Sequence, residues 1–105
     1  MLIAIVPAYN ESSMIRDVVE SLLPQVDRVV VIDDASTDDT AMHAEAVGAI
    51  VLTHPVNLGQ GAALETGHEY ARMLNADMVL HFDGDGQFDA ADIVSAKKMI
   101  EDGID

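Results

Sequence analysis

The chain has 105 residues, of which 19 are acidic and five are basic, so its formal net charge is −14 with His counted as neutral. Half of the residues are apolar, which is too many for a disordered acidic tail. The negative charge argues against a protein that neutralises nucleic-acid phosphates. No apolar run reaches the ~18 residues that a transmembrane helix needs.

The chain contains no Cys, which excludes disulfides, thiolate zinc sites and a cysteine nucleophile. The apolar stretch at residues 2–6 lacks the basic flank and the small-residue cleavage site of a secretory signal. We therefore expect a soluble, cytoplasmic protein in which residues 1–105 form a single domain. A chain of this length buries roughly 60–70% of the surface that its unfolded form exposes, which is enough for one modest core.

Four short apolar runs predict β-strands, at residues 2–6, 28–33, 49–53 and 77–82. The first strand is expected to end at Pro7. The runs are continuous instead of alternating with polar residues, which is typical of strands buried on both faces of a parallel sheet.

Helices are predicted between and after these strands, at residues 13–23, 37–47, 60–74 and 89–103. The first carries an apolar face made of Met14, Ile15, Val18, Val19, Leu22 and Leu23. The second follows an N-cap cluster at residues 36–39 and ends at Gly48. The third is expected to face inward with Ala63, Gly67, Tyr70, Ala71 and Leu74. The order β-α-β-α-β-α-β-α predicts an α/β fold with a doubly wound, mainly parallel sheet.

Ligands of open α/β sheets bind beyond the carboxyl ends of the strands. Polar and small residues follow all four predicted strands, at residues 7–11, 33–37, 57–61 and 83–87. We therefore expect these four segments to line one cleft.

The segment Asp83-Gly84-Asp85 carries the sharpest chemical signal. Its two carboxylates can aim at one point if the turn is tight, and glycine permits such a turn. Oxygen ligands of this kind suit Mg²⁺ or Mn²⁺, and Gln87 can add a carbonyl oxygen or hold a metal-bound water. The alternative interpretation is a polar turn that caps the strand and the next helix. A calcium loop does not fit, because its third ligand and terminal Glu are missing.

The pair Asp33-Asp34 has two interpretations. Its carboxylates can accept hydrogen bonds from a base or from ribose hydroxyls, or they can cap the next helix. Residues 36–39 already supply that cap, which favours a ligand role for at least one of the pair. Asn10 and Glu11 are individually weak candidates, because polar residues are also common in a first helical turn.

Gly59-Gln60-Gly61 opens the third predicted helix, where glycines favour a phosphate as well as simple capping. A dinucleotide fingerprint needs its glycines after the first strand and a third glycine where this chain has Leu64, so a dehydrogenase is disfavoured. Of the four His residues, His54 alone is expected near the cleft.

Taken together, the four strand-end segments resemble the N-terminal half of a family 2 glycosyltransferase with the GT-A fold. The matching segments are 5–11 (Ile-Val-Pro-Ala-Tyr-Asn-Glu), 31–38 (Val-Ile-Asp-Asp-Ala-Ser-Thr-Asp), 57–63 (Asn-Leu-Gly-Gln-Gly-Ala-Ala) and 82–89 (Phe-Asp-Gly-Asp-Gly-Gln-Phe-Asp). The last segment, a DXD motif, is similar to that of dolichyl-phosphate mannosyltransferases and related polyprenyl-phosphate glycosyltransferases.

The resemblance implies that residues 1–105 form a nucleotide-sugar-binding domain, the Rossmann-like half of a GT-A fold. It places a UDP- or GDP-sugar against Pro7, Tyr9, Asn10, Glu11, Asp33, Asp34 and Gly61. It places Mg²⁺ or Mn²⁺ on Asp83, Asp85 and Gln87. The implied reaction is transfer of the sugar with inversion to an acceptor, which in the similar enzymes is a polyprenyl phosphate. No catalytic residue is assigned, because the acceptor half of such enzymes follows the matched region.

Two departures from the family pattern stand out. Gln60 occupies a position where many family members carry Lys or Arg, so charge neutralisation would depend more on the metal and on helix dipoles. Family members also continue for about as many residues again, and we therefore expect weak or no transfer by the chain alone. A missing half would leave a strand edge and apolar surface uncovered, which makes self-association an expectation.

The alternative function is a truncated, non-catalytic nucleotide-binding or interaction module, which would bind nucleotide without transferring sugar. A pyrophosphorylase-like nucleotidyltransferase would need a Gly-rich basic loop where this chain has residues 7–11. A response-regulator receiver would need an acidic pair after the first strand and an Asp after the third, and neither is present.

Overall fold

We describe a computed structural model of the chain, and the residues that it describes are 1–82. Its elements are β1 (Leu2–Ala8), α1 (Ile15–Leu22), the 3₁₀ turn η1 (Leu23–Gln25), β2 (Arg28–Asp33), α2 (Thr40–Ala46), β3 (Ile50–Thr53), α3 (Gln60–Met73) and β4 (Met78–His81). All four predicted strands and the first three predicted helices are confirmed. The fourth predicted helix, at residues 89–103, lies outside the described residues.

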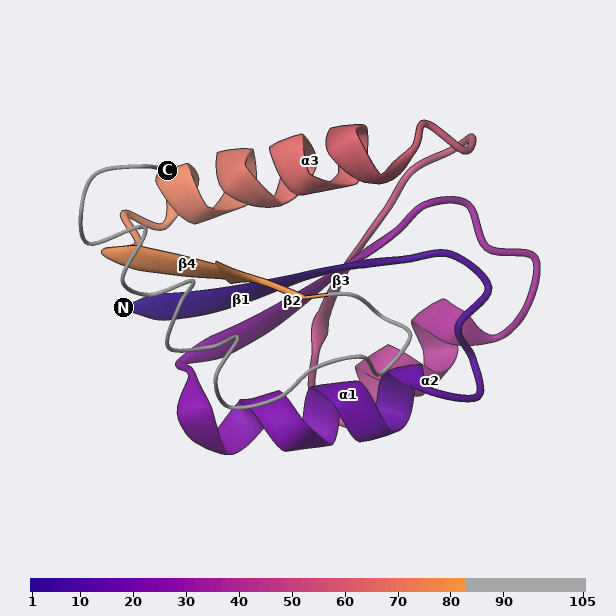
Figure 1. Cartoon of the computed structure of the whole chain (residues 1–105), viewed down its shortest axis with the longest axis horizontal. Coiled ribbons are helices and arrows are strands. Elements are labelled where there is room, and N and C mark those ends of the chain that lie inside the picture. The colour runs from indigo at the N-terminus through magenta and orange to yellow at the C-terminus, as the bar shows by residue number, and fades with distance from the viewer. Residues whose placement is uncertain (83–105) are drawn as a thin grey trace.

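The strands form one parallel sheet in the order β3-β2-β1-β4. Figure 1 shows α3 on one face of this sheet and α1 and α2 on the other. The predicted α/β class with a parallel sheet covered on both faces is confirmed. Because all four strands run the same way, the segments that follow them leave the sheet at one edge, the carboxyl edge.

β1 continues through Pro7 to Ala8, so the prediction that Pro7 ends the strand was wrong. Successive backbone groups of a strand point to opposite sides. Ile5 O accepts from Phe82 N on the β4 side, and Ala8 O accepts from Asp34 N on the β2 side. Pro7 is in phase with Ile5, so its ring nitrogen points to the β4 side, beyond the last paired residues, Ile5 and His81. The missing N–H therefore costs no hydrogen bond with the described part of β4.

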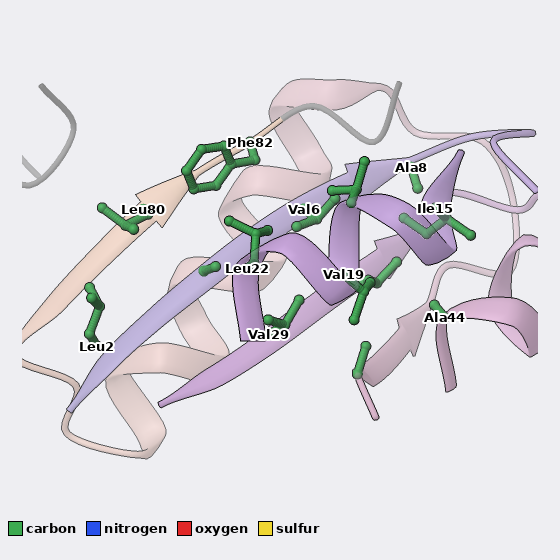
Figure 2. Packing of buried hydrophobic residues seen from close by; sticks show 14 residues of the cluster. Leu2, Val6, Ala8, Ile15, Val19, Leu22, Val29, Ala44, Leu80 and Phe82 are labelled. Carbon is green, nitrogen blue, oxygen red and sulfur yellow. The ribbon is translucent and has the colours of Figure 1, made fainter. Parts of the chain in front are cut away.

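One apolar layer lies between the sheet and the helices α1 and α2 (Figure 2). Even-numbered residues of β1 point into it, and the inward face of α1 supplies Ile15, Val18, Val19 and Leu22. The predicted apolar face of α1 is thus confirmed for these four residues. Met14, which we expected on the same face, precedes the helix and is exposed. The odd-numbered Ile3 and Ile5 point to the opposite layer, which explains why the strand sequence is apolar without alternation.

The opposite layer is thin where α3 crosses β1. Ala63, Gly67 and Ala71 are the buried residues of α3, as predicted, and Tyr70 and Leu74 pack partly buried beside them. A Cβ added at Gly67 would lie 2.9 Å from Ile5 Cδ1, which is too close for real atoms. Small side chains therefore let α3 approach the sheet closely.

α2 begins at Thr40, three residues later than the sequence predicted. The N-cap residue is Asp39, which belongs to the expected polar cluster, but its side chain makes no capping hydrogen bond. Asp38 Oδ1 instead accepts the N–H of Thr40, the first residue of the helix, over 3.0 Å. Its predicted end at Gly48 is confirmed by the left-handed φ of +105°. No helix of the described residues is long and apolar enough to cross a membrane.

Candidate functional site: the carboxyl edge of the sheet

Asn10 fastens the segment after β1 to the segment after β2. Its backbone N–H donates to Ser36 Oγ over 2.9 Å, and its side-chain Oδ1 accepts the N–H of Thr37 over 2.8 Å. Asn10 has a φ of +54°, a left-handed conformation that Asn tolerates better than most residues. The described contacts of Asn10 are thus internal, and they fix the relative positions of the two segments.

The same two segments are joined again beside Asn10. Glu11 N–H donates to Thr40 Oγ1 over 2.9 Å, and Ser12 N–H donates to Asp38 Oδ2 over 3.2 Å. The hydroxyl and the N–H of Thr40 also donate to Asp38 Oδ1. The Thr40 hydroxyl, with help from this N–H and Ser12, lowers the pKa of Asp38 to about 2. Asp38 therefore stays ionised and holds the loop after β1 against the start of α2.

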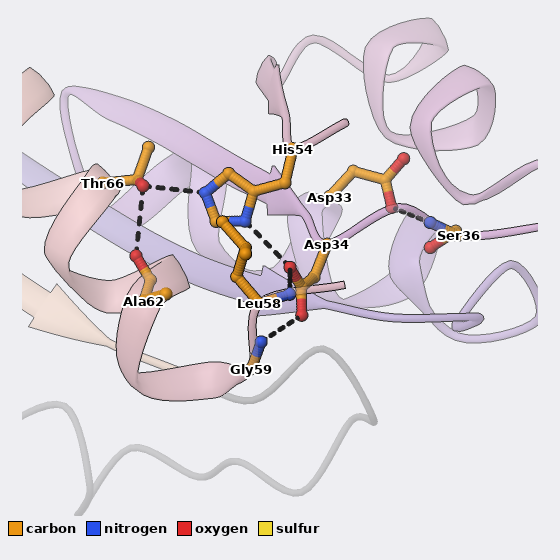
Figure 3. Close-up of polar contacts among 8 residues, drawn as sticks. All are labelled: Asp33, Asp34, Ser36, His54, Leu58, Gly59, Ala62 and Thr66. Carbon is orange, nitrogen blue, oxygen red and sulfur yellow. Dashed lines mark hydrogen bonds and ion pairs between the residues drawn. The ribbon is translucent and has the colours of Figure 1, made fainter. Parts of the chain in front are cut away.

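Asp34, the second residue of the predicted acidic pair, lies at the centre of a buried network (Figure 3). Its Oδ1 accepts from His54 Nδ1 over 2.8 Å and from Leu58 N–H over 2.9 Å, and its Oδ2 accepts from Gly59 N–H over 2.8 Å. Because a carboxylate only accepts, His54 Nδ1 carries a proton. The other ring nitrogen, Nε2, is hydrogen-bonded to Thr66 Oγ1 over 2.8 Å.

Two opposing effects set the pKa of Asp34. Burial is the largest single effect and would raise the pKa, because it disfavours the charged form. The donors from Leu58, His54 and Gly59 together outweigh burial, and the pKa is lowered below the ordinary value of 3.8. Asp34 is therefore a carboxylate whose oxygens are occupied by protein donors, and it joins the end of β2 to the start of α3.

Asp33 differs from its neighbour. It is buried, with 4% of its surface exposed, and its Oδ1 accepts the N–H of Ser36 over 3.1 Å. That bond closes a turn directly after β2, whereas α2 begins only at Thr40. Asp33 thus has a smaller set of described protein donors than Asp34, and neither carboxylate caps the first turn of α2.

The remaining nucleotide-site candidates are spread along the edge. Pro7 lies within β1, and Tyr9, just after the strand, has 45% of its surface exposed. Gly59 precedes α3 with a φ of +96°, and Gly61 lies in the first turn with no heavy atom within 4 Å of the place a Cβ would take. Among the described residues, the space that a side chain at Gly61 would take is thus open.

The predicted metal ligands Asp83, Asp85 and Gln87 lie outside the described residues. In the sequence, Asp83 comes directly after the buried Phe82, and Asp85 and Gln87 follow soon after it. Within residues 1–82, no group of three or more His, Asp or Glu side chains is placed to hold a metal ion.

Two features of the structure were missed by the sequence analysis. His54 was expected near the cleft, but its partner Thr66 was not identified, because twelve residues separate them and no short-range spacing links them. His68 of α3 and His81 of β4 also meet, with their Nε2 atoms 2.7 Å apart. A sequence gives no signal for either pair until the packing of α3 on the sheet is known.

Comparison with known proteins identifies the family. The family model "Glycosyl transferase family 2" matches residues 3–104. The chain belongs to glycosyltransferase family 2. The resemblance drawn from the four strand-end segments is thereby confirmed.

Curated relatives are about twice as long as the chain or longer. It is 32% identical to the UDP-N-acetylglucosamine–dolichyl-phosphate N-acetylglucosaminyltransferase of Methanococcus voltae, with 95% of the chain and 47% of the relative covered. It is 34% identical to glycosyltransferase AglJ of Haloferax volcanii, with 94% of the chain and 32% of the relative covered. The chain thus spans about a third to a half of these relatives.

The fold also matches a solved structure over part of that structure's length. Glucosyl-3-phosphoglycerate synthase of Mycobacterium tuberculosis, in complex with Mn²⁺, UDP and glucosyl-3-phosphoglycerate, superposes with a TM-score of 0.67 at 33% identity. The match covers 80% of this chain and 33% of that one. Another structure of that synthase contains Mg²⁺ and UDP. The GT-A-like arrangement expected from the sequence is therefore confirmed.

Proposed function

We propose that the chain is the donor-binding part of a glycosyltransferase that takes a sugar from a nucleoside diphosphate sugar with the help of Mg²⁺ or Mn²⁺. The observation that carries this proposal is the construction of the carboxyl edge. Three segments far apart in sequence are tied together there by Asn10, Asp38 and Asp34, and the open start of α3 lies beside them. The solved synthase that the fold matches was crystallised with UDP and Mn²⁺.

The nucleotide is proposed to lie against the segment after β1 and the end of β2. Pro7, Tyr9, Asn10 and Glu11 would line one side of its pocket, with the half-exposed ring of Tyr9 available for contact. Asp33 is the better candidate for a direct contact with base or ribose, because Asp34 is engaged by three protein donors. Gly61 would contribute open backbone near the diphosphate.

Asp83, Asp85 and Gln87 are proposed to hold the metal. Their oxygen donors match the preference of Mg²⁺ and Mn²⁺ for carboxylates and carbonyls together with substrate phosphates. When bound, the metal would act as a Lewis acid for the negative charge that grows on the departing nucleoside diphosphate. Such a cation would supply positive charge that this chain offers sparingly, because it carries five basic residues against 19 acidic ones.

We further propose a lipid phosphate as the acceptor and inversion at the anomeric carbon. The Methanococcus relative is named for a dolichyl-phosphate acceptor, which supports a lipid phosphate acceptor here. Such a phosphate is already a nucleophile, so it needs little general-base help, and direct displacement would invert the anomeric carbon. The solved synthase is named for a phosphoglycerate acceptor instead. A shared feature of both acceptors is an anionic oxygen or phosphate group.

Calorimetry on the 105-residue chain tests the proposed function. We expect UDP or GDP to bind only when Mn²⁺ or Mg²⁺ is present, and Asp83→Ala and Asp85→Ala to weaken this binding at least about tenfold. Glu101→Ala is the matched control, because it removes a carboxylate that has no proposed role. Equal binding without metal, or in both Asp variants, would show that the metal assignment is wrong.

The alternative function, a non-catalytic nucleotide-binding module, is separated by a second measurement. A chain that binds the metal–nucleotide complex, yet releases no UDP from UDP-sugars with phosphate, phosphoglycerate or lipid phosphate acceptors, would support that alternative. Release that depends on one of these acceptors would support the transferase.

A further inference from the structure

One carboxylate organises the whole connection between β3 and α3. The three donors to Asp34 all come from this connection, at His54, Leu58 and Gly59. At its beginning, His54 N–H also donates to the carbonyl oxygen of Asp33 over 2.9 Å. The connection is thus held against the end of β2 at its first residue and at its last two, as Figure 3 shows.

His54 holds a special place among the three donors. Leu58 and Gly59 donate backbone N–H groups, which any residue except Pro supplies, whereas His54 donates from its ring. Its second ring nitrogen bonds to Thr66, which lies in the second turn of α3 and whose hydroxyl also donates to the carbonyl of Ala62. The ring therefore connects Asp34 to the body of α3 as well as to the loop that precedes it.

This connection is buried. The side chains of His54 and Asp34 are 9% and 6% exposed. Within the described residues, both ring nitrogens of His54 are engaged by protein partners, so the ring has no free polar atom to offer a ligand. An effect of His54 on a ligand must therefore act through the atoms that it holds.

We propose that His54 is a positioning residue for the nucleotide-sugar donor. Through Asp34 and Thr66 it sets the place of Leu58 and Gly59 and, with them, the direction of the first turn of α3. This inference rests on the proposed function, which places the diphosphate of the donor beside Gly61. Small displacements of a binding group weaken a ligand strongly, since productive sites are held within about 0.5 Å.

The variants are chosen to remove one hydrogen bond at a time. His54→Phe keeps a buried ring without any N–H, and His54→Asn keeps a donor close to the place of Nδ1 while losing the contact with Thr66. Thr66→Val removes the hydroxyl at nearly constant shape, and Thr66→Ser keeps it. Gly48→Ala is the control for general destabilisation, because a φ of +105° strains Ala and the residue lies before β3, away from the carboxyl edge.

Affinity for UDP in the presence of Mn²⁺ is the first readout, measured well below the unfolding temperature of every variant. We expect His54→Phe to bind at least about tenfold more weakly, as is usual when a supporting hydrogen bond behind a binding group is lost. Thr66→Val and His54→Asn should fall between this variant and the wild-type chain. Thr66→Ser and Gly48→Ala should bind as the wild-type chain does.

Amide signals of Leu58 and Gly59 in the ligand-free chain are the second readout. Their hydrogen exchange should accelerate in His54→Phe and Thr66→Val but stay unchanged in Gly48→Ala and Thr66→Ser. If the wild-type chain binds UDP and both His54→Phe and Thr66→Val bind it with the same affinity, the positioning role is overturned and the proposed function stays intact. An equal loss of affinity in Gly48→Ala would overturn it too. If the wild-type chain bound no nucleotide, the proposed function would itself fail.

Discussion

Aspartates serve both edges of the sheet, but they do so in opposite surroundings. At the amino edge, Asp27 Oδ2 accepts the N–H of Leu2 over 2.6 Å, and Asp77 pairs with the N-terminal ammonium group. Both residues are exposed, and the Asp77 side chain is 76% exposed. At the carboxyl edge, Asp34 is 6% exposed and accepts from three donors.

This difference shows that burial, and not the residue type, decides what a carboxylate does here. Water replaces a lost partner at the amino edge, whereas a lost partner at Asp34 leaves buried N–H groups without an acceptor. The carboxyl edge is therefore held in place by buried contacts that water cannot replace, which suits the donor site proposed there. The amino edge only closes the ends of the strands.

The largest effect is expected from Asp34→Asn. A single amide oxygen would replace two carboxylate oxygens, and the amide NH₂ group would then face either Gly59 N–H or the pair of donors from His54 and Leu58. We expect a loss of about 3 kcal/mol in the free energy of unfolding, because buried donors that lose their acceptor each cost about 1–3 kcal/mol. Urea unfolding measures it, with Asp27→Asn as the matched control at the amino edge. Equal losses in the two variants would erase the contrast between the edges.

Gly67→Ala is expected to come next, because its new methyl group would collide with Ile5. Overpacking of this kind costs about 1–3 kcal/mol of unfolding free energy. Gly61→Ala on the same helix is the control for stability, since its methyl group would enter open space. The urea midpoint of Gly61→Ala should not fall, because Ala favours a helix more than Gly does. Midpoints that fall equally in both variants would show that the close approach of α3 to Ile5 does not set the effect.

Acid should affect the carboxyl edge through Asp34. Its pKa is lower in the folded chain than the ordinary 3.8, so the unfolded chain binds the proton more readily. The resulting stability is fully present above 3.8 and is lost as the pH falls through the folded value. At a pH below 3.8, we expect the urea midpoint of the wild-type chain to be lower than at neutral pH. The fall should be smaller in Asp34→Asn, and a fall of the same size would remove Asp34 from the explanation.

The smallest effect is expected from Asp77→Asn at the amino edge. Asp77, which pairs with the ammonium group of Met1, is exposed to water, and exposed ion pairs contribute little to stability. Urea midpoints at low and high salt should match those of the wild-type chain within error. A clear loss that disappears at high salt would show that the amino edge also depends on its charges.

Most of the fold was predictable because local patterns carry it. Continuous apolar runs predicted all four strands, and spacing predicted the inward residues of α1 and α3. Pro7 was the main error in the sheet, since a proline reads as a stop unless one knows that its nitrogen lies beyond the paired part of β4. The late start of α2 has a similar origin, because Ser36 and Thr37 bond to Asn10 in another segment.

The sequence predicted where the candidate site residues gather, but not which hydrogen bonds they make. Parallel strands must bring their following segments to one edge, so Asn10, Asp33, Asp34 and Gly61 could be gathered there from strand order alone. Their partners could not be assigned in this way. The bonds from Asp34 to His54, Leu58 and Gly59 span 20 to 25 residues. Such contacts form only when two connections pack side by side.

The amino-acid pattern was thus enough to predict the α/β class and the family, both of which are confirmed, because hydrophobic periodicity and short motifs are written in neighbouring residues. It also predicts a ligand site at the carboxyl edge. Only the tertiary structure showed that Asp33 and Asp34 have different hydrogen-bond partners. The two residues are identical in type and adjacent in sequence, and their surroundings differ because Asp34 faces the connection to α3 while Asp33 closes the turn after β2. Long-range contacts of this kind have no period and no motif, so only the folded arrangement reveals them.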